Sequence, residues 1–307
     1  MQKSLSQQFD TSFGLDATVS VSQNMLWAIP KKGRLNERCM SLLQGAGISF
    51  FRPNRLDVAR CDCLPITLVF LPAADIAKYV GEGNVDLGIT GIDVVEESEV
   101  DVDTILNLGF GKCKLALQAP VIAGITSASE LTGGRIVTSF PNLTRRFFQQ
   151  RDTAEKKTTI KYISGSVEAA CGLGLADGVV DLVETGTTMR AAGLEVVAEL
   201  LSTEAVMIAS KTSQKKDMIE MVKKRIDGYI TSTKYMLIQY NISRKDLPSA
   251  ILVTPGKRSP TISSLEGEDA VAVSALVSKS DSASIMDQLE SGSFTDMKSL
   301  FTVSQNL

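Results

Sequence analysis

The chain has 307 residues, of which 44% are hydrophobic, and this is enough for two or three domains with a sizeable buried core. Its formal net charge of −3 excludes a global positive field of the kind that favours nucleic acid or acidic membranes. The sequence contains no histidine, which excludes an imidazole base, imidazole metal ligands and a Ser-His-Asp triad.

The N-terminal segment, residues 1–24, is polar and has neither a continuous apolar region nor an arginine-rich amphipathic pattern. We therefore expect no targeting signal there, and no run of 18 or more apolar residues predicts a membrane span. The five cysteines are odd in number and lack paired CxxC spacing, which favours a reduced, cytoplasmic protein. Cys61 and Cys63 flank Asp62, but without a histidine or a second cysteine pair this triplet is a poor zinc site.

Strand and helix patterns then alternate as in βαβ units. A strand over 25–29 is followed by Lys31, Lys32 and Arg34 at the start of a helix, so three cations lie at one strand-to-helix junction. From this pattern alone, a solvated charged loop is as good an interpretation as an anion site. Further strands are expected over 56–59, 66–70 and 85–91, with a helix from about residue 74.

The strand over 85–91 ends in Thr90 and Gly91, directly before a helix that contains Asp93. These residues are expected at the carboxyl edge of a parallel sheet, where open α/β folds bind ligands, although a packing glycine gives the same pattern. Residues 108–119 form a strand that is expected to carry the chain into a second lobe.

In the second lobe, a strand over 136–140 leads into a helix that starts at Pro141 and bears Arg145 and Arg146. These two arginines cannot both face one site, because neighbouring helical residues diverge by about 100°. The segment 163–168, ISGSVE, is another polar turn that precedes a helix.

The most informative turn follows the apolar, β-branched run 179–183, which is interrupted only by Asp181 and is typical of a buried parallel strand. The run ends at 184–188, ETGTT, before a helix. A glycine lets the backbone turn closely, and threonine hydroxyls with the first free N–H groups of a helix suit an anion. For an isolated TGTT, an ordinary capped strand-to-helix turn is the commoner interpretation.

A strand over 205–209 is expected to return the chain to the first lobe, and an amphipathic helix follows over 218–229. From about residue 231 the pattern becomes βαββαβ, over 235–240, 245–251, 261–265, 270–277, 283–289 and 300–303. This order predicts a small antiparallel sheet with two helices on one face, a ferredoxin-like or ACT-like module. Such modules often bind small effectors or self-associate, but the fold alone establishes neither role.

Seven segments occur in the order found in one enzyme family: WAIPKKGRL, VGEGNVDLGITGID, LGFGKCKL, IVTSFPNL, SGSVEAA, GLADGVVDLVETGTTMRAAGL and TPGKRSPTIS. Through them, from Met25 to Lys279, the chain closely resembles the long form of the ATP phosphoribosyltransferases, nearest to the fungal branch. The resemblance implies an α/β fold with a two-lobed body like a type II periplasmic binding protein and a C-terminal regulatory domain. It also implies transfer of phosphoribosyl from phosphoribosyl pyrophosphate to N1 of ATP, with release of pyrophosphate, in the first step of histidine biosynthesis.

The domain boundaries expected from this resemblance are 25–112 with 203–230 for lobe I, 113–202 for lobe II and 231–307 for the regulatory domain. By resemblance, the ribose 5′-phosphate is held by four residues of one turn: Thr185, Gly186, Thr187 and Thr188. Glu168 and Asp181 are the implied catalytic carboxylates, which bind ribose hydroxyls and stabilise the positive charge that develops on the reacting carbon.

The residues implied for ATP and pyrophosphate are Lys31, Arg34, Arg55, Thr90, Gly91, Ser139 and Asn142. Glu184 is assigned no contact, because a carboxylate beside a phosphate dianion costs energy unless it turns away or caps a backbone N–H. Magnesium, Mg2+, is expected to arrive on the substrate phosphates rather than in a protein metal cage.

The resemblance also implies homo-oligomers, as dimers and hexamers, and inhibition by histidine bound to the C-terminal domain. The tail residues 291–296, SGSFTD, replace the Gly-Ala turn expected before the final strand, which puts the register of that strand in question. A non-catalytic cytosolic sensor of a small anion, with the C-terminal domain as its output, is the alternative function. Formation of pyrophosphate from ATP and phosphoribosyl pyrophosphate distinguishes the two.

Overall fold

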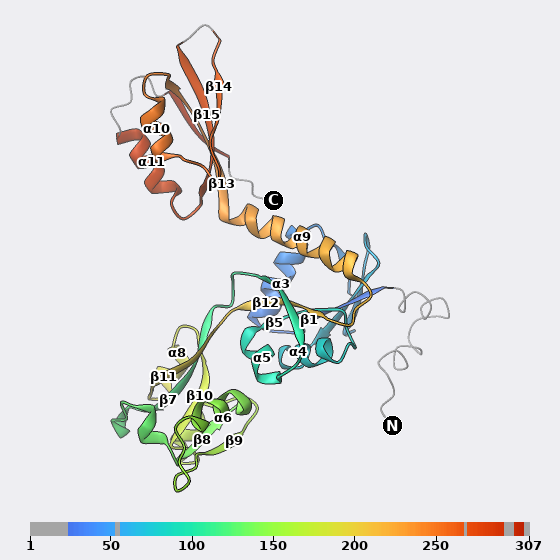
Figure 1. Ribbon diagram of the computed structural model, residues 1–307, viewed down its shortest axis with the longest axis vertical. Helices are drawn as coiled ribbons and strands as arrows, with labels where there is room; N and C mark the ends of the chain where they lie inside the picture. The colour runs from blue at the N-terminus through green and yellow to red at the C-terminus, as the bar shows by residue number, and fades with distance from the viewer. Residues whose placement is uncertain (1–23, 53–55, 267–268, 292–297, 304–307) are drawn as a thin grey trace. The chain divides into compact units, whose positions relative to one another are not determined.

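The computed structural model describes residues 24–52, 56–266, 269–291 and 298–303. The chain divides into two compact units, Met1–Lys224 and Arg225–Leu307 (Figure 1). The expected pyrophosphate ligand Arg55, the N-terminal extension up to residue 23 and the tail segment 292–296 lie outside the described residues. Within the described part of the chain, no helix is both long enough and apolar enough to cross a membrane.

Lobe I is built on a seven-stranded sheet in the order β2-β3-β4-β1-β5-β12-β6. Its strands are β1 (Met25–Pro30), β2 (Phe50–Phe51), β3 (Val58–Cys61), β4 (Ile66–Leu71), β5 (Leu87–Gly91), β6 (Val102–Asn107) and β12 (Ala205–Ser210). Its helices are α3 (Arg34–Gly45), α4 (Ala73–Gly81) and α5 (Ile92–Ser98). The central strands β1, β4 and β5 are parallel and almost wholly buried, as their continuous apolar runs predict.

Lobe II is built on a five-stranded sheet in the order β11-β7-β10-β8-β9. Its strands are β7 (Cys113–Pro120), β8 (Arg135–Thr138), β9 (Thr159–Tyr162), β10 (Gly178–Val183) and β11 (Leu194–Thr203). Its α-helices are α6 (Pro141–Gln149), α7 (Ala169–Gly172) and α8 (Thr187–Ala191), and two short 3₁₀ helices lie at Val121–Ala123 and Ala128–Leu131. In this lobe β8 is parallel to both β9 and β10.

Each of these two sheets contains one strand that reaches it from the other lobe. In lobe I, β12 follows directly after β11 and pairs antiparallel with β5 and β6. In lobe II, β7 follows β6 and pairs antiparallel with β10 and β11. Five strands of lobe I, in the order β4-β1-β5-β12-β6, correspond to the five of lobe II, in the order β9-β8-β10-β7-β11, and two crossovers join the sheets. This arrangement confirms the predicted body like a type II periplasmic binding protein.

Four of these strands, β2, β6, β9 and β11, were not predicted from the sequence. All four lie at the edge of a sheet, and the burial of β6 and β11 does not follow a simple alternation. In β11, the pairing with β7 shifts register twice, between Val196 and Ala198 and between Glu199 and Leu201. A strand with such irregularities loses the period of two that reveals strands in a sequence.

The C-terminal unit has the predicted βαββαβ order. Its elements are β13 (Tyr235–Ser243), α10 (Leu247–Val253), β14 (Thr261–Ser264), β15 (Ala270–Ser278), α11 (Ser282–Ser291) and β16 (Lys298–Val303). Its four strands form an antiparallel sheet in the order β14-β15-β13-β16, which is the ferredoxin-like arrangement. The preceding helix α9 (Lys216–Lys234) contains the boundary between the two compact units.

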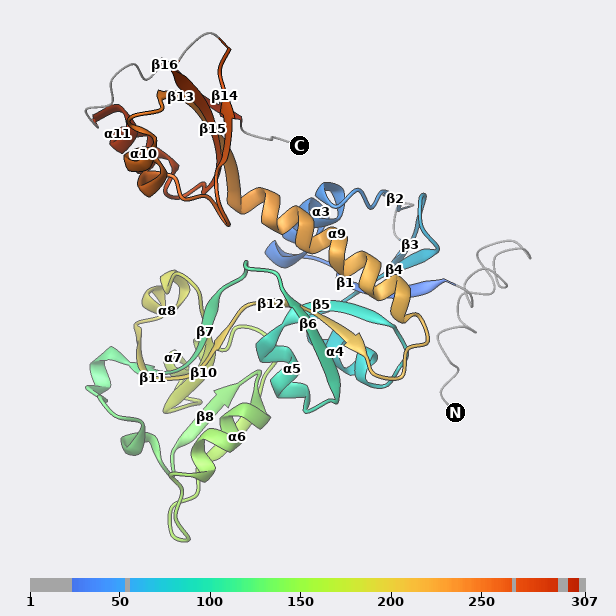
Figure 2. The same ribbon diagram turned by 45° about the horizontal axis from the view of Figure 1, so that its top comes forward.

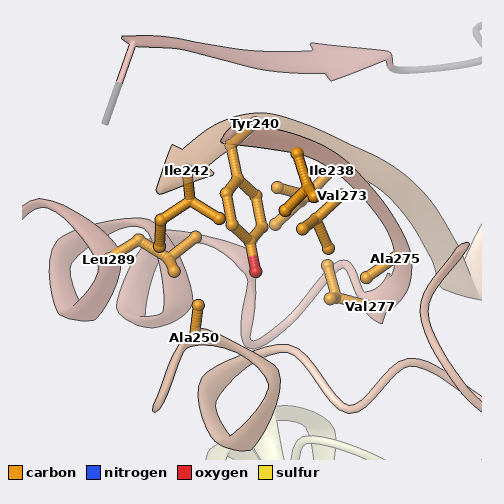
Figure 3. Close-up of a cluster of buried hydrophobic side chains, with 9 residues drawn as sticks. Ile238, Tyr240, Ile242, Ala250, Val273, Ala275, Val277 and Leu289 are labelled. Atoms are coloured by element: carbon orange, nitrogen blue, oxygen red, sulfur yellow. The ribbon is translucent and has the colours of Figure 1, made fainter. Parts of the chain in front are cut away.

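The core of the C-terminal unit lies between its sheet and its two helices. Figure 3 shows Tyr240 pointing from β13 into a cluster of aliphatic side chains from β15, α10 and α11. The Tyr240 hydroxyl lies 2.6 Å from the buried Thr254 hydroxyl, which satisfies the polar end of this large side chain. The buried cluster consists of residues of this unit alone, so the unit has a hydrophobic core of its own.

Close packing of α4 on β5 depends on a glycine. A Cβ atom at Gly88 would lie 2.6 Å from Ile76 Cγ2 and 2.9 Å from Val80 Cγ2, closer than side chains pack. We expect Gly88→Ala to lower the free energy of unfolding by about 1–3 kcal/mol. The measurement is urea unfolding followed by the fluorescence of Trp27, the single tryptophan, which lies on the neighbouring strand β1.

The matched control is Gly228→Ala, because no atom lies within 4 Å of a Cβ placed at this position in α9. Alanine there is expected to leave the unfolding midpoint unchanged or to raise it, since glycine costs a helix interior about 0.5–1 kcal/mol. An unfolding midpoint for Gly88→Ala equal to that of the unsubstituted protein would contradict the packing argument.

Candidate active site

The turn between β10 and α8 has the geometry that the TGTT sequence predicts for a tight polar turn. Gly186 adopts φ 73°, in the left-handed region that glycine enters without steric cost, and it precedes the first residue of α8. The hydroxyls of Thr185 and Thr187 lie 3.0 Å apart, and both side chains are exposed. Arg190 spans the turn by donating from Nη2 to the Thr185 carbonyl at 2.8 Å. The turn therefore gathers hydroxyls, the first N–H groups of a helix and a guanidinium on one exposed surface.

The two carboxylates implied for catalysis, Asp181 and Glu168, lie within electrostatic reach of each other. Burial raises the pKa of Asp181 above its ordinary value, and the charge of Glu168 raises it as well. A hydrogen bond of 2.8 Å from the Leu182 N–H to Asp181 Oδ1 opposes this shift. Asp181 comes from β10 and Glu168 from the segment before α7, so the fold joins residues that the sequence separates.

Glu184, which begins the polar turn, forms an ion pair with lobe I. Its Oε2 lies 2.7 Å from Nη1 of Arg34, the first residue of α3. The carboxylate is thus directed to a guanidinium, which reduces its repulsion of an anion on the adjacent turn. Sequence reasoning named both residues but did not foresee that they meet.

Lys31 also has a carboxylate partner. Its Nζ lies 2.6 Å from Asp57 Oδ2, and Arg52 lies 3.4 Å from the other oxygen of the same carboxylate. Both members of the Lys31–Asp57 pair are about half exposed, so the pair is screened by solvent and can exchange for another anion.

A buried carboxyl lies close to the crossover strands. Asp93 is 5% exposed, and burial raises its pKa while a hydrogen bond of 2.6 Å from the Thr203 hydroxyl opposes that shift. Burial also raises the pKa of the Cys113 thiol to about 11, with further contributions from the charges of Asp93 and Glu184. The charges of Asp93 and Glu184 thus act on Cys113 at the start of β7, and Cys113 is protonated at neutral pH.

The other residues implied for ATP binding have different surroundings. The Thr90 side chain is fully buried and donates to the Ala73 carbonyl at 2.9 Å, so its hydroxyl fixes the start of α4. Gly91 and Ser139 are partly exposed at the ends of strands. Asn142 is partly buried, and both its backbone N–H and its side-chain Nδ2 donate to Glu97 of lobe I.

Glu97 is the contact residue that sequence reasoning missed. Nothing in the local pattern IDVVEES distinguishes it from the exposed acids beside it, because its partners lie on a helix in the other lobe. Only the spatial arrangement of the lobes identifies it.

Among the described residues, no group of three or more His, Cys, Asp or Glu side chains is arranged to hold a metal ion. The donor atoms at the polar turn are hydroxyls, N–H groups and a guanidinium, which suit an anion better than a bare cation.

Comparisons with known proteins give one consistent result. The family profile described as ATP phosphoribosyltransferase matches residues 72–228, and the profile described as "HisG, C-terminal domain" matches residues 232–294. The ATP phosphoribosyltransferase of Yarrowia lipolytica is 46% identical over 286 residues, which cover 92% of this chain and 97% of the relative. That of Saccharomyces cerevisiae is 48% identical over 280 residues, which cover 90% of this chain and 94% of the relative.

A solved chain of the ATP phosphoribosyl transferase (HisG:HisZ) complex from Thermotoga maritima superposes with a TM-score of 0.60 at 27% identity. The superposition covers 67% of this chain and 98% of that chain. The profile described as ATP phosphoribosyltransferase spans more than half of the chain, and the two fungal relatives match 90% or more of it. The chain therefore belongs to the ATP phosphoribosyltransferase family.

Proposed function

We propose that this ATP phosphoribosyltransferase transfers the phosphoribosyl group of phosphoribosyl pyrophosphate to N1 of ATP, at the carboxyl end of β10. The observation that carries the proposal is the proximity of Glu168 to Asp181, next to the exposed turn 185–188. The products are N1-phosphoribosyl-ATP and pyrophosphate, and the reaction is the first step of histidine biosynthesis. Release of pyrophosphate from ATP and phosphoribosyl pyrophosphate by the purified chain is the direct test.

The turn 185–188 binds the ribose 5′-phosphate in this proposal. Gly186 in the left-handed conformation lets the backbone approach an oxygen of the phosphate, and the N–H groups of Thr187 and Thr188 lack a carbonyl partner within α8. The Thr187 N–H lies 3.5 Å from the Thr185 hydroxyl, a long contact that a phosphate oxygen can replace. The hydroxyls of Thr185 and Thr187 converge at 3.0 Å and add further donors. Binding through N–H and hydroxyl groups orients the ribose without adding a counter-charge near its C1.

Asp181 and Glu168 act on the ribose itself. Each carboxylate accepts hydrogen bonds from ribose hydroxyls, and their negative charge stabilises the positive charge that grows on C1 as the bond to pyrophosphate lengthens. The attacking N1 of adenine forms the new bond to C1, and the pyrophosphate leaves with the electron pair of the broken C–O bond. The partial burial of Asp181 strengthens this stabilisation, because less water screens its charge.

Lys31, Arg34 and Arg55 hold the pyrophosphate and the triphosphate. In the free protein, Lys31 and Arg34 are paired with Asp57 and Glu184. A guanidinium has five N–H donors, so Arg34 can contact a phosphate oxygen while one nitrogen stays on Glu184. Magnesium bound to the substrate phosphates neutralises charge on the leaving pyrophosphate.

Gly91, Ser139 and Asn142 line the cleft in this proposal, whereas Thr90 supports the edge of the sheet from its buried position. We also assign the chain to the cytoplasm. All five cysteines are free in the structure, which suits a reducing compartment.

We expect Thr188→Ala and Gly186→Ala to impair the use of phosphoribosyl pyrophosphate much more than they impair folding. Loss of one hydrogen bond to a charged phosphate costs about 1.5–3 kcal/mol, so kcat/KM for this substrate falls by roughly tenfold or more. Gly186→Ala adds the strain of a side chain at φ 73°, and its Cβ lies 2.7 Å from Arg190 Nη1 and 3.5 Å from Met189 Cε, which are ends of long side chains rather than backbone atoms. Steady-state kinetics with each substrate varied in turn measures the effect.

Thr188→Ser is the matched control, because serine keeps the hydroxyl and is expected to retain most of the activity. Unchanged kinetics for phosphoribosyl pyrophosphate in both Thr188→Ala and Gly186→Ala would rule out the phosphate role of the turn.

We expect Asp181→Asn to lower turnover without lowering stability. The pKa of Asp181 is raised in the folded protein, so its ionised form costs stability at any pH above that pKa, and the neutral amide removes this cost. Glu168→Gln is expected to lower turnover as well and to shift the acid limb of the pH–rate profile to lower pH. The reason is that the Glu168 charge helps to raise the pKa of Asp181.

Asp177→Asn is the matched control with the opposite sign. A hydrogen bond and ion pair with Arg135 lower the pKa of Asp177, so its charge stabilises the fold above the ordinary pKa of an aspartate and this stability disappears as the pH falls. The control is expected to lose stability while the folded fraction keeps its turnover. If Asp181→Asn behaved in the same way, its role would be structural.

The C-terminal unit is proposed to bind free histidine and to inhibit the enzyme within a homo-oligomer, a dimer or a hexamer. The support is the match of residues 232–294 to the family's C-terminal domain and the separate, complete core of this unit. A small effector acts at a distance only if it binds two states of the assembly with unequal affinity.

We expect histidine at millimolar concentration to inhibit the full chain but not a chain truncated after Lys234, where α9 ends. Initial rates of pyrophosphate release, measured with and without histidine, check the inhibition, and sedimentation gives the state of assembly. A full chain that histidine leaves unaffected at these concentrations would exclude the regulatory proposal, while the catalytic one would stand.

A further inference from the structure

Helix α6 of lobe II begins without a cap of its own. Its first residue is Pro141, and the residue before it, Phe140, has no side-chain acceptor. The first backbone N–H that reaches a carbonyl four residues earlier belongs to Thr144, which donates to Phe140 at 3.0 Å. The N–H groups of Asn142 and Leu143 therefore need acceptors from outside the helix.

Glu97 of lobe I supplies both acceptors. Its Oε1 accepts from the Asn142 N–H at 2.8 Å, and its Oε2 accepts from the Leu143 N–H at 2.9 Å. Its backbone carbonyl also accepts from Asn142 Nδ2 at 2.9 Å. A carboxylate that receives two N–H groups at the positive end of a helix is a charge-assisted cap, here provided by a different lobe.

The contact is reciprocal, because α6 in turn caps the end of α5. Arg146 Nη2 donates at 2.7 Å to the carbonyl of Glu96, one of the last carbonyls of α5 that lack a partner within the helix. A cation at the negative end of α5 and an anion at the positive end of α6 both suit the helix dipoles. Figure 2 shows α5 and α6 next to each other where lobe I meets lobe II.

This pair of caps has consequences for the cleft. The covalent links between the lobes are two crossovers, which leave the angle between rigid lobes adjustable, as in hinged two-lobed proteins. Ser139 and Asn142, which we assign to the cleft, belong to the segment that leads into α6. Whatever holds the first turn of α6 therefore also sets the distance between the substrate-binding surfaces of the two lobes.

We propose that Glu97 is a positioning residue, which holds lobe II against lobe I in the arrangement in which the two bound substrates can react. The inference rests on the proposed function, because it assumes that ATP and phosphoribosyl pyrophosphate meet between the lobes. Glu97 does not contact either substrate in this proposal. It acts by holding the backbone N–H groups in the first turn of α6.

The test is Glu97→Gln in the full chain. An amide keeps the size of the side chain, but its NH₂ group faces one of the two backbone N–H donors and cannot accept from it. The expected result is a fall in kcat of about tenfold or more, with less than about threefold change in the affinity of each substrate measured alone by calorimetry. The backbone amides of residues 142 and 143 are expected to exchange with deuterium faster than in the unsubstituted protein.

Glu96→Gln is the matched control, since Glu96 contacts Arg146 mainly through a backbone carbonyl that the substitution keeps. It is expected to leave kcat and the amide exchange unchanged. Glu97→Asp keeps the charge on a shorter side chain and is expected to lie between Glu97→Gln and the unsubstituted protein.

Two results would overturn the proposal: normal kcat in the folded fraction of Glu97→Gln despite faster amide exchange, or a rise in KM with kcat unchanged. If the unsubstituted chain releases no pyrophosphate, the proposed function itself fails. The amide exchange then still reports whether the Glu97 cap exists, so the two failures are distinguishable.

Discussion

The exchange of one antiparallel strand between the two lobes links the two sheets that carry the described candidate site residues. Because β12 joins the sheet of lobe I and β7 joins the sheet of lobe II, the carboxyl ends of the parallel strands in both lobes open toward the crossovers. Thr90 and Gly91 end β5, and Asp181 lies near the end of β10, on the two sides of this junction. The buried Asp93–Thr203 hydrogen bond fixes one crossover to the start of α5. A ligand that touches both lobes is therefore bound by residues whose spacing the two sheets set.

Two cations proposed for the phosphates are paired with carboxylates in the structure, which bears on how a chain of net charge −3 could accept anionic substrates. Arg34 is paired with Glu184 and Lys31 with Asp57, so the cations are held in place without an unbalanced positive surface. Exposed pairs of this kind contribute little to stability, about 0–1 kcal/mol, so a phosphate can share or replace the carboxylate at small cost. The pair of Glu184 with Arg34 also reduces the repulsion between Glu184 and a phosphate on the adjacent turn, because a cation from the other lobe offsets the charge of Glu184.

Much of the fold follows from the sequence because buried strands leave continuous apolar runs, as the parallel strands β1, β4 and β5 and the antiparallel strand β12 do. The βαββαβ order of the C-terminal unit is equally readable, since β13 and β15 alternate buried and open positions. The edge strands β2, β6, β9 and β11 were missed. Bulges break the period of β6 and β11, β2 has only two residues, and β9 is exposed at most of its positions. The polar turn was predicted from its residue types, whereas the roles of Asp181 and Glu168 came from family resemblance. Neither the residue pattern nor the family resemblance predicted the role of Glu97. Its sequence context is that of an exposed acid on a short helix, and its partners are backbone N–H groups of α6 in the other lobe.

The site combines several features that each act against stability. Asp181 is partly buried beside another carboxylate, Gly186 gives up side-chain contacts to reach φ 73°, and Asp93 is a carboxyl enclosed by the protein. A neutral residue in place of Asp181 removes a cost of desolvation, so stability alone does not account for this carboxylate. In the proposed function, Asp181 supplies negative charge near C1 of the ribose and Gly186 lets the backbone approach a phosphate. The caps between α5 and α6 act in the opposite sense, since they satisfy two helix ends while they hold the lobes together. In the proposed function, the stabilising caps beside the cleft offset the cost to folding of groups that stabilise the transition state instead of the folded protein.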